Sequence, residues 1–378
     1  MKIALVGTVA SAILGFRRDF ILELVSRNFT VYAFATDYNP ELRGKVLELG
    51  AIPVDYKMNR SGLNPVNDVL SLFELRSLFK EIKPHIVFSF FSKPVIFATL
   101  AAKFAGVNRI IGMLEGLGYV FTDQPNGLSL KLLLLRRVQV LLYRLAIPLL
   151  DRVIFLNKDD PFDLIKRNSI KSRHIDILGG IGLRLEDYLF SIPPIVPVRF
   201  IFVGRLLAEK GIYDFIEAAR IVKRRCSSAE FVVLGSVDSA NPGSIPQKTL
   251  DDLVSERLIV YPGQVSNVVE WLSGSSVFVL PSYYREGFPR STQEAMAVGR
   301  PIITTDVPGC RETVMDGVNG YLVPKWSPEK LAEKMFVFVK EPNLIAVMGL
   351  QSRQVAEKEF DSKLVNSRLF DIVVGNDD

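Results

Sequence analysis

Two glutamates, Glu286 and Glu294, stand eight positions apart in the second half of the chain. The apolar run Val277–Leu280 before them predicts a buried strand, and Arg290–Val298 predicts the start of a helix. The pair is therefore expected at a turn from strand to helix, where open parallel sheets bind their ligands. Carboxylates at such a turn can accept hydrogen bonds from a hydroxyl-rich ligand.

A structural explanation competes for one member of this pair. Ser291-Thr-Gln-Glu294 spells a capping box, in which Ser291 would cap the helix and Glu294 would bond back to it. Capping explains Glu294 but gives no duty to Glu286, which precedes Gly287 and Pro289 on the loop. The local motif by itself leaves both the structural and the functional interpretation open.

Length and composition indicate a folded protein of about two domains. The 378 residues are 48% hydrophobic and 23% charged, which is typical of a globular chain. Cys226 and Cys310 are the two cysteines and His85 and His174 the two histidines, so a disulfide framework, a structural zinc site and a histidine triad are not expected. We expect neither a cofactor nor a metal.

Positive charge is concentrated in the N-terminal half. Residues 1–190 contain 25 Lys and Arg against 18 Asp and Glu, a net charge of +7, whereas the remainder carries −2. Such asymmetry suits an anionic partner. Because the chain has no lysine-rich tract or aromatic-basic repeat, we predict a membrane surface and no nucleic acid.

The segment Leu128–Leu150 is unusually apolar but carries Lys131, Arg136, Arg137 and Arg144. These charges are too frequent for a transmembrane helix. An ordinary crossover helix is favoured over a helix on a membrane surface. Both hold if one basic face of the helix is exposed.

The first half alternates between strand-like and helix-like segments. Gly7 and Thr8 split the apolar N-terminus, so we interpret it as a strand, loop and helix rather than a secretory signal peptide. Expected helices include Asn67–Glu81 and Ile96–Ala105. Expected strands are Ile3–Val6, Val31–Phe34, Ile86–Phe90, Arg109–Met113 and Val153–Leu156. This alternation predicts a doubly wound parallel sheet over residues 1–190.

The same pattern restarts after a proline-rich break. Three prolines within Ser191–Pro197 predict an extended linker. A second domain over 198–360 is expected to contain the helix Ile212–Arg225 and the strands Phe200–Val203, Phe231–Leu234, Leu258–Tyr261, Val277–Leu280 and Pro301–Thr305. The fold class is thus α/β, with two Rossmann-like domains facing each other across a cleft, a common place for a ligand site.

Two cations follow the first strand of the second domain. Arg205 and Lys210 lie between Gly204 and Gly211 on one strand-to-helix loop, where they could clamp a diphosphate or could be solvated surface charges. At another strand end, Gly235 would let backbone approach a ligand closely. The expected helix start near Arg290 would offer free amides to an anion.

These motifs resemble the family 4 retaining glycosyltransferases of GT-B fold, most specifically over residues 200–325. The resemblance rests on Gly204-Arg205…Lys210-Gly211, Pro281-Ser282…Glu286-Gly287-Phe288-Pro289…Glu294-Ala295 and Gly299-Arg300-Pro301-Ile302. It implies that Glu294 binds the ribose of a nucleoside diphosphate sugar and that Glu286 lies by the transferred sugar. Arg205 and Lys210 would hold the diphosphate. The remaining expected donor-binding residues are Gly204, Gly235, Gly287, Phe288, Pro289, Arg290 and Ser291.

The resemblance also implies a terminal helix, within 361–378, that crosses back to the N-terminal domain. Many relatives have a histidine near the acceptor, but the matching strand end here reads Gly112-Met-Leu-Glu115-Gly116-Leu-Gly118. This version resembles a subgroup that extends sugars linked to undecaprenyl diphosphate. Glu115 would then be a base or a ligand of the acceptor hydroxyl. Gly116, Arg17 and Lys93 are the further expected acceptor-binding residues.

Taken with the resemblance, the sequence predicts a retaining, metal-independent glycosyltransferase. It would move a hexose or N-acetylhexosamine (GalNAc, GlcNAc, Gal or Glc type) from a UDP-sugar to an undecaprenyl-diphosphate-linked saccharide in O-antigen, capsule or glycan assembly. We expect it as a peripheral protein on the cytoplasmic face of the inner membrane. Alternatives are a nucleotide-sugar 2-epimerase and a non-catalytic sugar-nucleotide-binding membrane protein. A dehydrogenase is disfavoured because no Gly-x-Gly-x-x-Gly follows the first strand.

Overall fold

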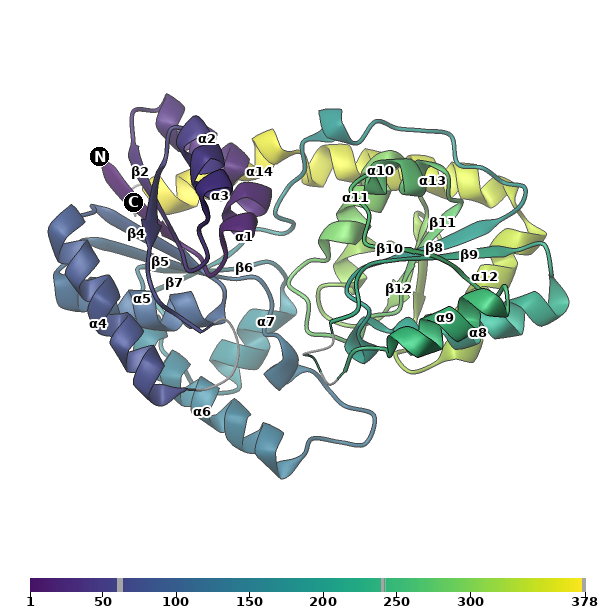
Figure 1. Cartoon of the computed structure of the whole chain (residues 1–378), viewed down its shortest axis with the longest axis horizontal. Coiled ribbons are helices and arrows are strands. Elements are labelled where there is room, and N and C mark those ends of the chain that lie inside the picture. Colours follow the sequence, from purple (N-terminus) through teal and green to yellow (C-terminus); the bar gives the residue numbers. More distant parts are fainter. Residues whose placement is uncertain (60–63, 239–240, 242, 376–378) are drawn as a thin grey trace. The chain divides into compact units, whose positions relative to one another are not determined.

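The computed structural model describes residues 1–59, 64–238, 241 and 243–375. Its contacts divide the chain into two compact units, each built on its own parallel sheet (Figure 1). The first unit comprises Met1–Val120, Ser129–Ile181 and the chain from Ser362 onward. The second comprises Phe121–Leu128 and Gly182–Asp361.

The sheet of the first unit has the strand order β3-β2-β1-β4-β5-β6-β7, and all its pairings are parallel. Its central strands are buried on both faces, because crossover helices cover a parallel sheet from both sides. The strands are β1 (Lys2–Val6), β2 (Thr30–Ala35), β3 (Ile52–Asp55), β4 (Ile86–Phe90), β5 (Arg109–Leu114), β6 (Arg152–Phe155) and β7 (His174–Ile177).

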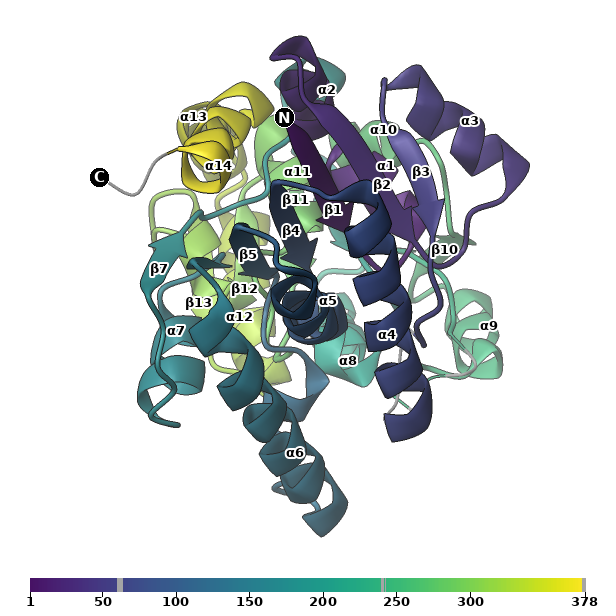
Figure 2. The ribbon, with the colours of Figure 1, turned by 90° about the vertical axis from the view of Figure 1, so that its left-hand side faces the viewer.

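The helices of the first unit flank this sheet, and α5 contacts both α4 and α6 (Figure 2). They are α1 (Ala10–Phe16), α2 (Arg18–Ser26), α3 (Pro40–Glu48), α4 (Pro65–Ile82), α5 (Ser92–Ala105), α6 (Leu130–Ala146), α7 (Asp159–Pro161) and α14 (Ser362–Val374). The expected terminal helix is α14, which packs against α2. There Phe370 meets Phe29 edge-on at 6.0 Å, and Arg109 donates to the Val373 carbonyl at 2.9 Å.

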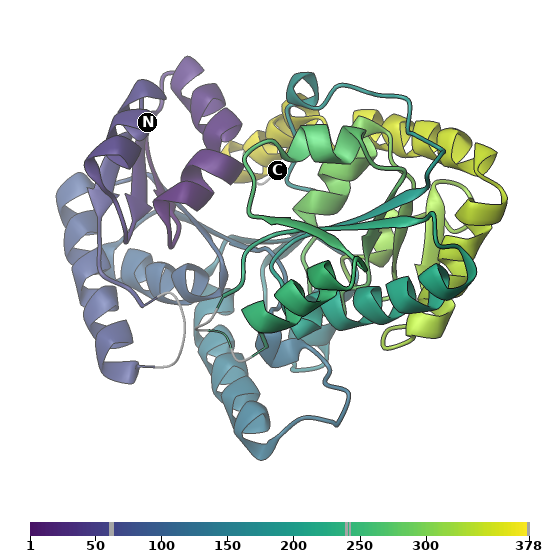
Figure 3. The same ribbon diagram turned by 45° about the vertical axis from the view of Figure 1, so that its right-hand side comes forward.

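The sheet of the second unit has the order β10-β9-β8-β11-β12-β13 and is also parallel. Helices flank this sheet as well (Figure 3). Its strands are β8 (Arg199–Val203), β9 (Glu230–Leu234), β10 (Val260–Gly263), β11 (Val277–Leu280), β12 (Ile302–Thr305) and β13 (Gly320–Val323). Its helices are α8 (Ile212–Arg225), α9 (Gln247–Ser255), α10 (Val268–Ser273), α11 (Arg290–Val298), α12 (Pro328–Lys340) and α13 (Asn343–Glu359).

The proline-rich segment Ser191–Pro197 lies within the second unit. The amide of Ser191 donates to the Val298 carbonyl at 3.1 Å, and its hydroxyl accepts from the buried guanidinium of Arg300 at 2.7 Å. The first residue of the segment is therefore fixed to the end of α11.

The ten expected strands are confirmed, with two corrections. Leu258–Tyr261 was predicted two residues early, because Leu258 and Ile259 are buried but precede β10 (Val260–Gly263). The sequence also missed β3, β7 and β13, which are edge strands of their sheets. An edge strand is less buried than a central one, so its apolar pattern is weaker.

Within the described residues, no helix combines the length and low charge that crossing a membrane would require. In the same part of the chain, no group of three or more His, Cys, Asp or Glu side chains is arranged to hold a metal ion.

Candidate active site

The second sheet reverses its strand order between β8 and β11, because β8 is flanked by β9 on one side and by β11 on the other. On the two sides of such a point, the chain leaves the sheet in opposite directions. The loops that follow β8 and β11 therefore diverge and leave room for a ligand. The loop after β8 carries Arg205 and Lys210, and the loop after β11 carries Glu286. The predicted donor residues thus flank the switch point of this sheet.

The ammonium of Lys210 forms an ion pair with Oε1 of Glu286. These two side chains are 14% and 10% exposed, so the pair is largely shielded from water. The Ser282 hydroxyl lies 3.1 Å from the same Oε1 and can donate to it. The structure therefore brings together two predicted site residues that are 76 positions apart.

The two loops are fastened to each other by their backbones. Both Tyr283 and Tyr284 donate their amides to the Glu209 carbonyl, at 2.9 and 3.0 Å. Gly211 has φ +81°, and a Cβ there would overlap the Pro281 carbonyl oxygen, so glycine is required for this approach. These backbone contacts therefore hold the loop of Lys210 and the loop of Glu286 together.

Tyr284 joins the second predicted cation to this pair. Its ring centroid lies 5.4 Å from the ammonium of Lys210 and 5.9 Å from the guanidinium carbon of Arg205. An aromatic face attracts cations at such distances. Sequence reasoning missed Tyr284, although the aromatic pair Tyr283-Tyr284, separated from Glu286 by Arg285 alone, was a visible signal.

Glu294 lies on the first turns of α11, but the predicted capping box is wrong. The helix begins at Arg290 after Pro289 and has no side-chain cap, so Ser291 lies inside it. Oε1 of Glu294 instead accepts from Arg290 Nε and from the Tyr188 hydroxyl, both at 3.0 Å. The cause is the i, i+4 spacing of Arg290 and Glu294, which offers this carboxylate a cation in place of a backbone amide.

Tyr188 is a second residue that the sequence did not reveal, since it stands 106 positions from its partner. Burial raises the pKa of its hydroxyl to about 12, and the neighbouring charge of Glu294 adds to this rise. The hydroxyl therefore remains a hydrogen-bond donor at neutral pH. It fixes one oxygen of Glu294.

Thr122 is a third such residue. Its buried hydroxyl accepts from the Arg285 amide at 3.0 Å, directly before Glu286. The adjacent Asp123 pairs with Lys325 at 2.5 Å. These contacts explain why Phe121–Leu128 groups with the second unit although its neighbours in sequence belong to the first.

The other expected donor-binding residues lie on the same loops. Gly235 has φ +146°, and a Cβ there would overlap the Gly204 carbonyl oxygen, so the fold itself requires glycine at this strand end. The Phe288 ring meets Phe360 edge-on at 5.1 Å. Gly287 and Pro289 are buried beside it. A ligand role for these residues stays a prediction.

In the first unit, Arg17 and Glu115 form an ion pair at the carboxyl edge of the sheet. Arg17 is 1% exposed, and its guanidinium also lies 3.9 Å from the Met113 sulfur and 4.8 Å from the Phe90 ring centroid. Glu115 is 10% exposed. These contacts favour a positioning role for Arg17, which holds the carboxylate of Glu115 in place.

Lys93, in the first turn of α5 after β4, pairs with the buried Asp68 of α4 at 2.7 Å. Phe91, between β4 and Lys93, has φ 70° and ψ 157°, a region that non-glycine residues rarely occupy. Gly116, after Glu115, has φ +105°. Phe91 and Gly116, which lie beside or among the predicted acceptor-binding residues, therefore both have positive φ.

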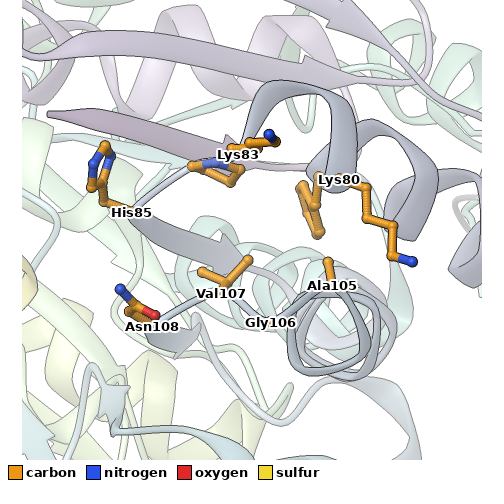
Figure 4. A pocket seen from close by; sticks show the side chains of 9 residues that line it. Lys80, Lys83, His85, Ala105, Gly106, Val107 and Asn108 are labelled. Atoms are coloured by element: carbon orange, nitrogen blue, oxygen red, sulfur yellow. The ribbon is translucent and has the colours of Figure 1, made fainter.

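A hollow of about 520 Å³ lies at the opposite edge of the first sheet (Figure 4). Lys83 and His85 line it before β4, and Val107 and Asn108 line it before β5. Ligand sites of parallel sheets lie at the carboxyl ends of the strands. This hollow is thus separate from the predicted site residues.

Comparison with known proteins identifies the family of this chain. Residues 2–154 match the family model described as glycosyl transferase 4-like, and residues 197–340 match the one described as glycosyl transferases group 1. Together the two matches span most of both sheets. The chain belongs to these glycosyltransferases.

Solved structures agree on the fold of this glycosyltransferase. An Anabaena protein in complex with UDP and glucose, HepE, has a TM-score of 0.77 at 14% identity and covers 100% of both chains. The fold is GT-B, as predicted.

Two curated relatives act on lipid-linked sugars according to their names. The glycosyltransferase is 27% identical, over 100% of both chains, to the N,N'-diacetylbacillosaminyl-diphospho-undecaprenol alpha-1,3-N-acetylgalactosaminyltransferase of Campylobacter jejuni. It is also 27% identical, over 68% of this chain and 67% of the relative, to the UDP-Gal:alpha-D-GlcNAc-diphosphoundecaprenol alpha-1,3-galactosyltransferase of Escherichia coli.

Proposed function

We propose that this glycosyltransferase moves a hexose or N-acetylhexosamine from a UDP-sugar to a saccharide linked to undecaprenyl diphosphate, in the assembly of a bacterial surface polysaccharide or glycan. The observation that carries the donor half is the Lys210–Glu286 ion pair at the switch point of the second sheet. The names of the Campylobacter and Escherichia relatives support the acceptor class.

The donor binds along the loops of the second unit. Glu294, held by Tyr188 and Arg290, offers its other carboxylate oxygen to the ribose hydroxyls. Lys210 and Arg205 contact the diphosphate, and the amides at the start of α11 add a positive dipole. Glu286, next to Lys210, accepts hydrogen bonds from the hydroxyls of the transferred sugar.

Transfer breaks the bond between the anomeric carbon and the diphosphate oxygen, so negative charge grows on the departing UDP. Lys210 and Arg205 stabilise this charge where it develops, which is the main electrostatic requirement of the reaction. Their two positive charges suffice for the diphosphate, and on this basis we propose that no divalent ion is needed.

The acceptor hydroxyl attacks from the face that the diphosphate leaves, so the anomeric configuration is retained. Its oxygen forms the new glycosidic bond, and its proton passes to the departing phosphate oxygen. Glu115, fixed by Arg17, accepts a hydrogen bond from this hydroxyl and orients it. Lys93 contributes positive charge on the acceptor side.

The proposed acceptor is anchored in a lipid bilayer, so the enzyme works at a membrane surface. We propose a peripheral location on the cytoplasmic face of the inner membrane, where the donor is dissolved and the acceptor is exposed. The net charge of +7 on residues 1–190 favours an anionic surface.

A donor and acceptor screen tests this proposal. Purified enzyme is incubated with radiolabelled UDP-GalNAc, UDP-GlcNAc, UDP-Gal or UDP-Glc and with lipid-diphosphate acceptors from bacterial membranes, and the product's anomeric configuration is read by NMR. We expect label in the lipid fraction with one donor, an α-linkage from an α-donor, and undiminished transfer in EDTA. Glu294→Ala should lose donor binding, measured by calorimetry with UDP.

The same assay without acceptor tests the competing epimerase activity. Formation of the 2-epimer of UDP-N-acetylhexosamine in the absence of any acceptor would overturn the transferase mechanism. Transfer to free glucose or sucrose but to no lipid-linked saccharide would overturn the acceptor class while leaving the donor assignment intact.

A further inference from the structure

Helix α6 of the first unit exposes leucines along one of its faces, and these form a stripe. Residues three and four positions apart lie on the same face of a helix. The four most exposed large apolar side chains of α6 are four, seven and four positions apart and so share one face: Leu130 (86%), Leu134 (62%), Leu141 (56%) and Leu145 (54%). The opposite face carries the buried Leu132, Val140, Tyr143 and Ala146, which anchor the helix in its unit. The exposed leucines therefore do not contribute to the packing of α6 against its unit.

Cations flank this leucine stripe on both sides. On a helical projection, Arg137 and Arg144 border one side of the stripe and Lys131 borders the other, and all three are exposed. No Asp or Glu occurs from Gln124 to Leu150. A groove of about 430 Å³ runs along the arginine side and is lined by Arg136, Arg137, Leu141 and Arg144 among others.

We propose that α6 is the surface by which the enzyme docks on an anionic lipid bilayer. Its 17 residues would lie in the plane of the membrane over about 25 Å. The leucines would enter the boundary between headgroups and acyl chains, while the long basic side chains reach the anionic headgroups beside them. This inference rests on the proposed lipid-linked acceptor, and it assigns the surface that brings the enzyme to that acceptor.

The charge pattern favours a bilayer over other occupants of this face. A symmetric contact between two copies through this face would bring Arg137 and Arg144 of one copy near those of the other. No carboxylate on α6 would neutralise these positive charges. A nucleic acid would leave the leucine stripe without a partner. An anionic membrane satisfies both the leucines and the cations.

Vesicle sedimentation tests the proposal without donor or acceptor. Unilamellar vesicles of phosphatidylcholine alone are compared with vesicles of equal parts phosphatidylcholine and phosphatidylglycerol. We expect the wild type to bind the anionic vesicles much more tightly. Leu134→Ser/Leu141→Ser should abolish binding, and Lys131→Gln/Arg137→Gln should weaken it by about fivefold per cation removed. Neither pair of substitutions should change the circular dichroism spectrum.

Matched controls on the second unit are Val347→Ser and Lys248→Gln, which alter exposed residues of the same kinds on α13 and α9. Both should bind vesicles like the wild type. Wild-type binding in the two α6 variants, or equal binding to neutral and anionic vesicles, would overturn the proposal. Conversion of a dimer to a monomer by the leucine substitutions in gel filtration would also overturn it, since the face would then be a protein interface.

A transfer assay separates this inference from the proposed function. With a short-chain, water-soluble lipid-diphosphate acceptor the α6 variants should retain wild-type turnover, whereas with the acceptor in vesicles they should lose it. If the wild type transferred no sugar to any lipid-linked acceptor but still bound vesicles through α6, the proposed function would fail and the docking surface would stand.

Discussion

Each of the two units places a largely buried cation against a glutamate at the carboxyl edge of its parallel sheet, but the two pairs are built differently. In the first unit Arg17, which is 1% exposed, holds Glu115 from between α1 and α2 and also contacts Phe90 and Met113. In the second unit Lys210, which is 14% exposed, meets Glu286 beside the ring of Tyr284.

This difference suits two tasks. A guanidinium enclosed by an aromatic ring and a sulfur atom is fixed, so Arg17 can orient Glu115 but cannot follow a ligand. An ammonium on a flexible stem can move from one partner to another, so Lys210 can contact both Glu286 and a diphosphate. The comparison favours a positioning cation in the first unit and a ligand-binding cation in the second.

The largest expected effect comes from removing Lys210, the proposed ligand-binding cation. Lys210→Ala should lower kcat by about 100- to 1,000-fold, because the charge on the departing diphosphate loses its stabilising partner. Lys210→Arg should recover part of this loss. Steady-state transfer kinetics measure the effect, and near-normal turnover of Lys210→Ala with an unchanged melting temperature would remove Lys210 from the mechanism.

Substitutions of Glu115 distinguish a hydroxyl ligand from a base. If Glu115 orients the acceptor hydroxyl, Glu115→Gln should lose about tenfold in kcat/KM and Glu115→Ala about 100-fold. If Glu115 removes the proton, both variants should lose about 100-fold or more. The readout is kcat/KM for the acceptor, with the donor KM as the internal control.

Thr122 should influence the donor site although it precedes it by more than 160 positions. Thr122→Val removes the hydroxyl that accepts from the Arg285 amide, so the turn before Glu286 loosens and kcat/KM should fall about fivefold. Thr122→Ser keeps this hydroxyl and should restore turnover. If Ser and Val variants are equally impaired, the hydrogen bond has no part in positioning Glu286.

The smallest effect concerns Asp214, a carboxyl in the first turn of α8 that belongs to neither ion pair. Burial raises its pKa from 3.8 to about 6, although a hydrogen bond from the Trp326 backbone acts to lower this pKa. The folded state therefore binds this proton more tightly than the unfolded state, and stability falls as pH rises from about 4 through about 6.

Asp214→Asn should consequently raise the melting temperature by about 2 °C at about pH 7.5 and leave it nearly unchanged at about pH 4. Calorimetry at the two pH values checks this difference. An equal shift at both would show that side-chain shape rather than ionisation is responsible.

The central strands and several helices could be predicted because burial leaves a local pattern. β4 and β11 are buried at every position and read as continuous apolar runs, and α8 was predicted with its observed bounds. The edge strands β3, β7 and β13 were not predicted, because a strand with one free edge is less buried and its apolar pattern is weaker.

The candidate site divides in the same way. Motifs at strand ends predicted Lys210, Glu286, Glu294 and Glu115 as site residues, because parallel strands bring their carboxyl ends to one edge of each sheet. The capping box suggested by Ser291 is not formed. Whether Glu294 bonds to a backbone amide or to Arg290 depends on where the helix begins, which the motif did not reveal.

The sequence by itself determined the α/β class, the two sheets and the loops that carry the predicted site residues, because periodicity and strand-end motifs are local. Only the tertiary structure decided the partners: Tyr188 for Glu294, Thr122 for the Arg285 amide and Arg17 for Glu115. These partners are about 100 or more positions apart, and no local pattern records which distant loops the sheets bring into hydrogen-bond distance.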